Sequence, residues 1–190
     1  MGLFDLAAPI FARFAHRVYP EWAREDLVDF VRGLPPGARV LDLGGGTGVL
    51  AAWARVTRPD LGLVVAEPSA AMRRHVPPAI EAVAARAEAL PFAAGSLDAV
   101  LIGEALHHFA DPGASLAEVA RVLRPGGGLW VYEFDPATLG GRVLWVLERL
   151  VGEPGHFVPP GDLKRRLLAL GIEARYRARG ASYVLRGEKS

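Results

Sequence analysis

The stretch of sequence that decides the fold is Val40-Leu41-Asp42-Leu43-Gly44-Gly45-Gly46-Thr47-Gly48, in which a short apolar run ends in glycines. A helical pattern follows from Thr47 to about Val56. A buried strand that runs into a glycine-rich turn and then a helix forms a ligand site. Glycines let the backbone approach the ligand closely, and the first N–H groups of the helix point at it. The stretch therefore predicts a nucleotide-like cofactor at the end of a strand.

The spacing of the glycines narrows the choice of cofactor. A phosphate-binding P-loop needs Gly-Lys followed by Ser or Thr, and the chain has no such sequence. A dinucleotide site needs the pattern G-x-G-x-x-G, which fails because Val49 stands at the third glycine position. The pattern that remains is Asp42-x-Gly44-x-Gly46-x-Gly48. A structural turn with incidental glycines is the alternative interpretation.

Strands and helices alternate along most of the chain. Apolar runs predict strands at about 40–43, 61–66, 80–85, 97–102, 129–134, 172–178 and 181–186, and helical patterns lie at about 21–33, 47–56, 112–123, 138–151 and 161–170. Nearly all-apolar strands indicate a sheet that is covered on both faces. Gly180 joins the last two strands as a hairpin. The sequence therefore predicts a doubly wound α/β, Rossmann-like fold with seven strands, mostly parallel, and an antiparallel C-terminal hairpin.

A second acidic residue, Glu67, follows the strand that ends at Ala66. In doubly wound folds an acidic residue about 20 positions after the glycine loop accepts hydrogen bonds from ribose hydroxyls. Glu67 lies 23 positions after Gly44, which fits that role. The alternative is a surface glutamate at a strand end. Ser69 and Asp111 are expected to cap the helices that follow them. Met72 lies either against an adenine or in the core.

Three later segments make a resemblance to a known family specific. They are Ala87-Glu88-Ala89-Leu90-Pro91-Phe92, then Ala105-Leu106-His107-His108-Phe109-Ala110-Asp111, and finally Arg121-Val122-Leu123-Arg124-Pro125-Gly126-Gly127. With the glycine loop they resemble class I S-adenosylmethionine (SAM)-dependent methyltransferases of the ubiquinone/menaquinone-biosynthesis type. The resemblance is strongest over residues 38–134. It implies SAM as cofactor and in-line methyl transfer to an O, C or N nucleophile of a small molecule, with apolar molecules among the candidate acceptors.

The resemblance also implies which residues hold the cofactor. The loop would seat the methionine end, with Asp42 near its amino group and Glu67 on the ribose. The implied contacts are Asp42, Gly44, Gly45, Gly46, Thr47, Gly48, Glu67, Pro68, Met72, Ala87, Glu88, Gly103 and Glu104. One position departs from the family, because Arg86 stands where an Asp typically meets the adenine amino group. An Arg side chain only donates, so Glu88, a carbonyl or packing would have to hold adenine.

The adjacent histidines follow the fourth predicted strand, at the edge where such folds bind ligands. We expect His107 to face the cofactor or acceptor and to act as a base, and His108 to pack structurally, with the reverse assignment left open. The pair does not predict a metal site, since two adjacent histidines share no helical face and no cysteine is present. The residues expected on the acceptor side are Phe11, Phe14, Tyr19, His107, His108, Trp145 and Phe157.

The length of 190 residues suits one methyltransferase domain. Within it we expect a helical N-terminal lid (1–35), a cofactor-binding core (38–134), and substrate-side helices with the hairpin (135–190). The apolar helix near 138–151 could cap an acceptor, form a dimer face or pack on the sheet. Two alternative functions stay open at this point: a SAM-binding domain without methyl-transfer activity, and an NAD-type oxidoreductase.

Composition sets the remaining expectations. A net charge of +1 gives no reason to expect nucleic-acid binding. No apolar run is long enough to span a bilayer, and no signal peptide is apparent, which favours the cytoplasm. The chain contains no Asn, Gln or Cys, a composition that favours a thermophilic source, with a GC-rich genome as the alternative cause. We expect a monomer or a homodimer.

Overall fold

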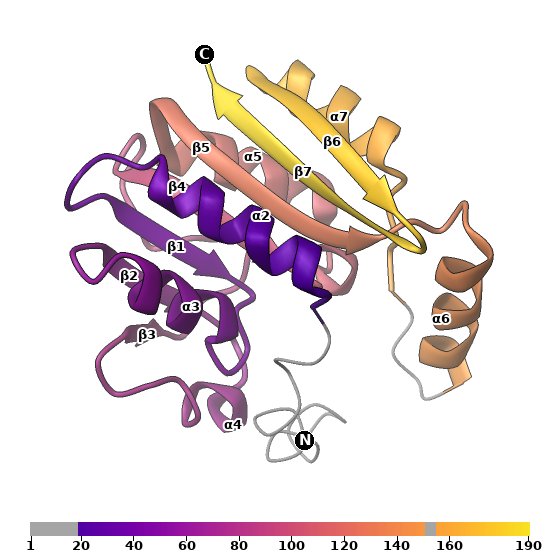
Figure 1. The fold of residues 1–190 in the computed structure, drawn as a ribbon, viewed down its shortest axis with the longest axis horizontal. Coiled ribbons are helices and arrows are strands. Elements are labelled where there is room, and N and C mark those ends of the chain that lie inside the picture. The colour runs from indigo at the N-terminus through magenta and orange to yellow at the C-terminus, as the bar shows by residue number, and fades with distance from the viewer. Residues whose placement is uncertain (1–18, 151–154) are drawn as a thin grey trace.

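The computed structural model describes residues 19–150 and 155–190 and places seven strands in one sheet, in the order β3-β2-β1-β4-β5-β7-β6 (Figure 1). The first five strands along the chain are parallel, and β7 runs antiparallel to both β5 and β6. The predicted fold class, including the antiparallel hairpin, is confirmed. The strands are β1 (Arg39–Leu43), β2 (Gly62–Ala66), β3 (Glu81–Val83), β4 (Leu97–Gly103), β5 (Leu123–Phe134), β6 (Ile172–Arg179) and β7 (Ser182–Lys189).

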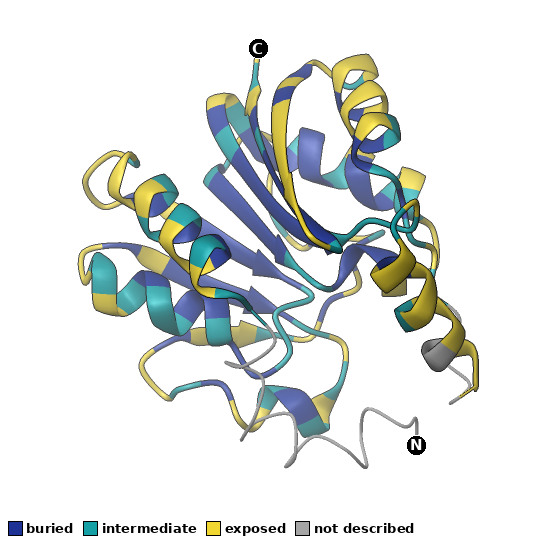
Figure 2. Cartoon of the chain, turned by 45° about the vertical axis from the view of Figure 1, so that its right-hand side comes forward, coloured by how far each residue is buried: buried dark blue, intermediate teal, exposed yellow. Residues whose placement is uncertain are grey.

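Helices cover both faces of this sheet, and two hydrophobic cores result. On one face α2 (Glu21–Arg32) and α3 (Val49–Thr57) pack on the strands, and on the other α5 (Pro112–Val122) and α7 (Pro160–Ala169) do so. Because side chains alternate along a strand, β1 sends Val40 into one core and Leu41 into the other. Figure 2 shows the resulting contrast, with buried strands between helices whose outer sides are exposed.

Three shorter or more exposed elements complete the described chain. They are α4 (Ala70–Arg73), a 3-10 helix over Leu106–His108, and α6 (Leu139–Leu150), which projects from the body of the domain in Figure 1. The predicted caps are confirmed: the Ser69 hydroxyl accepts the Met72 N–H at 3.2 Å, and the Asp111 carboxylate accepts the Ala114 N–H at 3.0 Å. Of the helices in the described ranges, none is both long and apolar enough to cross a membrane.

The start of β5 differs from the sequence prediction, which placed this strand at about 129–134. The strand begins at Leu123, which pairs with Leu97, and the next pair joins Gly128 to Ala99. One residue of β4 is therefore opposed by four residues of β5, which leave the ladder as a bulge. Pro125 within the bulge lacks the N–H that regular pairing would need.

The glycine loop leaves β1 in a conformation that favours glycine. Gly44, Gly46 and Gly48 have φ angles of +67°, +55° and +79°. The Gly44 N–H donates to the carbonyl of Ala66 at 2.8 Å, which ties the loop to the end of β2. A Cβ on Gly44 would lie 2.7 Å from the Cβ of Ala105, so the loop also packs closely on the segment after β4. Glycine is therefore required in this motif for two separate reasons. The positive φ angles are rarely adopted by other residues, and at Gly44 a side chain would collide with Ala105.

These two requirements can be separated by a pair of alanine variants. Gly37 has nearly the same φ, +68°, with nothing within 4 Å of its would-be Cβ. We expect Gly37→Ala to lose about 1–2 kcal/mol of unfolding free energy through backbone strain alone. Gly44→Ala should lose about 1–3 kcal/mol more through the clash with Ala105. Equal losses in urea unfolding would show that the loop does not pack against Ala105.

Candidate cofactor and acceptor site

The predicted cofactor residues gather at the carboxyl ends of β1, β2 and β4. Asp42 lies within β1, Glu67 directly follows β2, and Gly103 ends β4. β1 and β4 are adjacent in the sheet. The chain continues from β1 to β2 on one side of this pair, and from β4 to β5 on its other side. That reversal of strand order opens a crevice, which is where doubly wound sheets bind ligands.

Asp42 is the buried carboxylate at the start of the glycine loop. Its side chain is 1 % exposed, and its Oδ2 accepts the Ala51 N–H at 3.0 Å. Its Oδ1 has no hydrogen-bond partner among the residues that the structure describes. Burial raises the pKa of Asp42 to about 7, against the effect of the Ala51 hydrogen bond and with a further increase from the charge of Glu67. A buried acceptor of this kind suits a ligand with an N–H donor, above all a cationic one.

Glu67 closes the other side of the loop. Its Oε2 accepts the Gly46 N–H at 3.1 Å, and its Oε1 accepts the Ser69 N–H at 2.8 Å. The carboxylate is thereby fixed in place beside the loop. Met72 is buried, and its Cε is the nearest atom to a would-be Cβ on Gly46, at 3.7 Å. The expected ribose and adenine residues therefore adjoin the loop.

Arg86, which stands where the resembling family typically has an Asp, pairs with a nearby carboxylate. The Arg86 Nε lies 3.4 Å from Oε2 of Glu88, and the other carboxylate oxygen accepts the Asp111 N–H at 3.2 Å. Partial burial raises the pKa of Glu88, but hydrogen bonds from backbone N–H groups, including that of Asp111, and the charge of Arg86 outweigh it and lower the pKa. Arg86 thus pairs with the carboxylate two residues later, and Ala87 between them is buried.

Tyr19 lies against the end of β4. Its hydroxyl donates to the carbonyl of Gly103 at 3.0 Å, and a Cβ on Gly103 would approach that hydroxyl to 2.5 Å. Burial raises the pKa of Tyr19 well above its usual value, so the phenol stays a donor. Glu104 follows with φ +51°, a strained backbone for a residue other than glycine, and its N–H donates to the carbonyl of Tyr132 at 2.9 Å.

The two histidines have different surroundings. His107 is 3 % exposed, and its Nδ1 lies 2.7 Å from Oε2 of Glu133, whose side chain is also 3 % exposed. His108 is exposed. The expectation that His108 is the structurally packed histidine is wrong, because the 3-10 turn directs His107 inward onto Glu133. The catalytic role of His107 stays a prediction.

Glu133 was not identified from the sequence. It belongs to β5 and reaches the segment after β4, where its Oε1 accepts the Leu106 N–H at 2.9 Å. The available signal was a lone carboxylate in the otherwise apolar run Leu129–Phe134. A carboxylate at such a position is rarely buried without a partner, and His107 is that partner.

Two predicted acceptor-side residues line one cavity. Trp145 and Phe157 border a space of about 320 Å³, together with Pro136, Arg142, Gly155 and His156. The Phe157 ring also stacks on His107, with centroids 4.3 Å apart and an interplanar angle of 10°. The cavity therefore adjoins the histidine through one shared ring. Phe11 and Phe14 lie outside the described residues.

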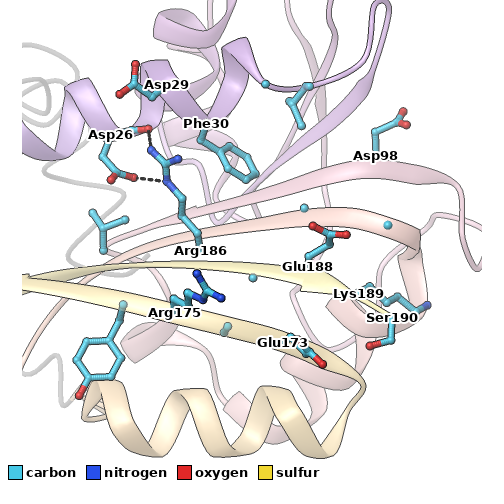
Figure 3. A pocket seen from close by; sticks show the side chains of 18 of the residues that line it. Asp26, Asp29, Phe30, Asp98, Glu173, Arg175, Arg186, Glu188, Lys189 and Ser190 are labelled. Atoms are coloured by element: carbon cyan, nitrogen blue, oxygen red, sulfur yellow. Dashed lines mark hydrogen bonds and ion pairs between the residues drawn. The ribbon is translucent and has the colours of Figure 1, made fainter.

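A wider groove of about 1060 Å³ lies between α2 and the open face of β7 and β6 (Figure 3). Two of its acidic side chains are paired with arginines: Arg186 donates to Asp26 at 2.7 Å, and Arg124 to Asp98 at 2.6 Å. Asp98 lies near the amino end of β4, opposite the glycine loop. The groove is thus separate from the predicted cofactor residues. The described ranges contain no cluster of three or more His, Cys, Asp or Glu that could hold a metal ion.

Comparisons with known proteins agree with this geometry. Residues 41–131 match the family model described as a methyltransferase domain. The ubiquinone/menaquinone biosynthesis C-methyltransferase of Hahella chejuensis is 35 % identical over 145 residues, which are 71 % of this chain and 56 % of that protein. The demethylmenaquinone methyltransferase of Mycobacterium sp. (strain KMS) is 41 % identical over 124 residues, covering 62 % of this chain and 50 % of that protein. The chain therefore spans about half the length of these relatives.

Solved structures show the same fold. A SAM-dependent methyltransferase from Thermotoga maritima has a TM-score of 0.78 and 23 % identity, with 98 % of both chains covered. A chain from the Haloferax volcanii complex of the Trm112 methyltransferase activator with a methyltransferase has a TM-score of 0.83 and 17 % identity, covering 99 % of this chain and 98 % of that one. At these identities the likeness concerns the fold alone.

The sequence matches and the fold support a class I SAM methyltransferase. The matched residues, 41–131, lie within the cofactor-binding core expected at 38–134. These findings favour the methyltransferase interpretation over the NAD-type alternative.

The raised pKa of Asp42 leads to a prediction for stability. Between the unfolded value of 3.8 and about 7, the folded chain keeps a proton on Asp42 that the unfolded chain releases. This group therefore makes stability fall as pH rises through that window, by on the order of a few kcal/mol. We expect Asp42→Asn to stabilise the ligand-free chain little at pH 4 and most at pH 8, measured by urea unfolding.

Asp60→Asn provides the control with the opposite sign. The side-chain hydrogen bond from Arg58, helped by the Gly37 N–H, lowers the pKa of Asp60. Its stabilising contribution is present above the unfolded pKa and is lost as pH falls, so Asp60→Asn should destabilise the chain at neutral pH. A stability difference for Asp42→Asn that does not change with pH would contradict the buried, proton-binding state of Asp42.

Proposed function

We propose that this chain uses SAM to transfer a methyl group to a small molecule through an O, C or N nucleophile. The observation that carries the proposal is the buried carboxylate of Asp42 beside the glycine loop, whose Oδ1 accepts no hydrogen bond from the described residues. The methionine end of SAM carries an ammonium group, a charge-assisted donor that fits this acceptor. The sequence relatives, which are named as methyltransferases, support the same function.

The remaining cofactor contacts follow from the elements around the loop. Glu67, held by the Gly46 and Ser69 N–H groups, is suited to two ribose hydroxyls. Met72, Ala87 and Glu88 would border the adenine. We propose that adenine is held by packing and by backbone groups, because the Glu88 carboxylate is already engaged by Arg86 and by the Asp111 N–H.

Bound SAM supplies a methyl group on a positively charged sulfur, so the chain needs no covalent intermediate. Its own task is to align the acceptor with the methyl–sulfur bond, which can lower a barrier by about 7–11 kcal/mol. We propose that the acceptor enters beside Trp145 and Phe157, whose cavity of about 320 Å³ suits a small, largely apolar molecule. His107 would accept the proton that the acceptor loses.

We propose the simplest cellular setting that fits the sequence. The chain would act as a monomer or homodimer in the cytoplasm of a heat-adapted organism, on small molecules and not on nucleic acid. The lack of Asn, Gln and Cys supports the heat-adapted source, and the net charge of +1 supports the choice of substrate. The relatives' pathway is not carried over to this chain.

Calorimetric titration with the demethylated cofactor, S-adenosylhomocysteine, tests cofactor binding. Because the ammonium requires an ionised Asp42 and burial raises its pKa to about 7, we expect binding to tighten about tenfold from pH 6 to pH 8. The heat should vary with the ionisation enthalpy of the buffer, since Asp42 releases a proton. Asp42→Asn should weaken binding and abolish this pH dependence.

Glu67→Gln separates the two carboxylates. Glutamine accepts at one oxygen only, so it cannot serve both the Gly46 and the Ser69 N–H. Binding should weaken, but its pH dependence should persist. No binding of S-adenosylhomocysteine at any pH, or tight binding of NADH, would refute the proposed cofactor. A labelled-methyl screen against phenols, quinols, amines and lipids then distinguishes an enzyme from a SAM-binding domain without activity.

A further inference from the structure

We propose that Glu133 is a positioning residue for methyl transfer: its carboxylate keeps a proton on Nδ1 of His107, so that Nε2 is the atom that takes the acceptor's proton. This inference rests on the proposed function, in which His107 is the base. It assigns a role to a buried acidic residue that lies outside the glycine loop, the ribose site and the family-like segments.

The hydrogen bonds of Glu133 determine where the imidazole proton lies. The Leu106 backbone N–H can only donate, so Oε1 of Glu133 is its acceptor, at 2.9 Å. Oε2 lies 2.7 Å from Nδ1 of His107. An ionised carboxylate only accepts, and therefore Nδ1 must carry the proton. In a neutral imidazole the lone pair is then on Nε2.

Two further contacts fix the orientation of His107. The Phe157 ring lies nearly parallel to the imidazole, with centroids 4.3 Å apart, and the His156 N–H donates to the carbonyl of His107 at 2.6 Å. His107 is thus held between the ends of β4 and β5 and the segment 155–157. This segment also borders the cavity proposed for the acceptor. A base that is fixed in this way needs little reorganisation when an acceptor binds.

Methyl transfer to the acceptor is coupled to the loss of the acceptor's proton. The O–H, N–H or C–H bond of the acceptor breaks, and its electron pair forms the new bond to the methyl carbon. The methyl–sulfur bond breaks and leaves its pair on sulfur, which becomes neutral. The acceptor proton moves to Nε2 of His107, and the imidazolium later releases it to water. No oxidant, reductant or further reactant is required.

Glu133 also compensates the charge that this step creates. An imidazolium at 3 % exposure would be costly to form without a partner, because burial disfavours a lone charge. The carboxylate at 2.7 Å supplies the opposite charge before the reaction begins. Removing that charge should therefore slow the chemical step more than it weakens substrate binding.

Glu133→Gln is the decisive variant because it is nearly isosteric but has a single acceptor oxygen. That oxygen must serve the Leu106 N–H, so the amide NH₂ faces Nδ1 and favours the tautomer protonated at Nε2. Two-bond ¹⁵N–¹H spectra of the ligand-free chain read this directly, with the His107 signals assigned from His107→Ala. We expect the Nδ1–H tautomer in the wild-type chain and the Nε2–H tautomer in Glu133→Gln.

Kinetics provide the second readout. Glu133→Gln and His107→Ala should each lower kcat about 100-fold, with the KM for the acceptor changed less than about threefold. The double variant should be no slower than His107→Ala, because the two residues act as a unit.

Asp98→Asn is the matched control: Asp98 also accepts one backbone and one side-chain N–H, at 2.8 and 2.6 Å, but near the amino end of β4. It should lower stability and leave both tautomer and kcat unchanged.

An unchanged tautomer or an unchanged kcat in Glu133→Gln would overturn the positioning role, as would additive losses in the double variant. The spectra are recorded without cofactor or acceptor, so they report on Glu133 independently of turnover. If the wild-type chain has the expected tautomer but methylates no acceptor, the proposed function fails, and the positioning role fails with it. If methylation proceeds but the tautomer is wrong, only the role of Glu133 fails.

Discussion

The candidate cofactor site depends on one constraint, which is the burial of the Asp42 carboxylate where the glycine loop leaves β1. A Cβ on Gly45 would lie 2.6 Å from Cγ of Asp42, so the loop can pass over this carboxylate only as bare backbone. The Ala51 N–H donates to the same group, which fixes the start of α3. Strand, loop and helix are therefore arranged around a side chain that would be more stable in water.

This arrangement predicts that the candidate site lowers the stability of the ligand-free chain at neutral pH. Burial raises the pKa of Asp42 to about 7, so ionising it in the folded state costs free energy. Glu67 faces the same loop from β2, and its negative charge adds to that cost. A cationic ligand reverses both effects, because it pairs with Asp42 and offsets the charge of Glu67. Burial of Asp42 thus favours the binding of a cationic ligand but lowers the stability of the ligand-free chain.

The sequence predicts those parts of the structure that depend on local interactions. The strand–loop–helix unit at about 40–56, the caps at Ser69 and Asp111, and the mostly parallel direction of the strands depend on local patterns and on apolar runs. They were predicted. The bulge that precedes Gly128 was not, because it depends on the register of β5 against Leu97 and Ala99. Local patterns do not specify such a register between strands far apart in the chain.

The pairing of Glu133 with His107 shows the same limit within the site. These residues are 26 positions apart and meet only because β4 and β5 are neighbours in the sheet. The motif that contains His107 could be recognised, but the identity of the packed histidine could not, since it depends on the turn over Leu106–His108. A lone carboxylate in an apolar strand gave a signal that a partner must exist, without naming it.

Asp42 and Glu133 together reveal how this sheet distributes polar groups. Each is a carboxylate buried toward the carboxyl end of a strand, on β1 and β5, and each accepts a backbone N–H from the segment that follows a strand. The strand order places β4 between them, where the connections diverge. One carboxylate has an oxygen without a partner among the described residues, whereas both oxygens of the other are engaged. The first is therefore suited to bind a ligand, and the second to orient a neighbouring side chain.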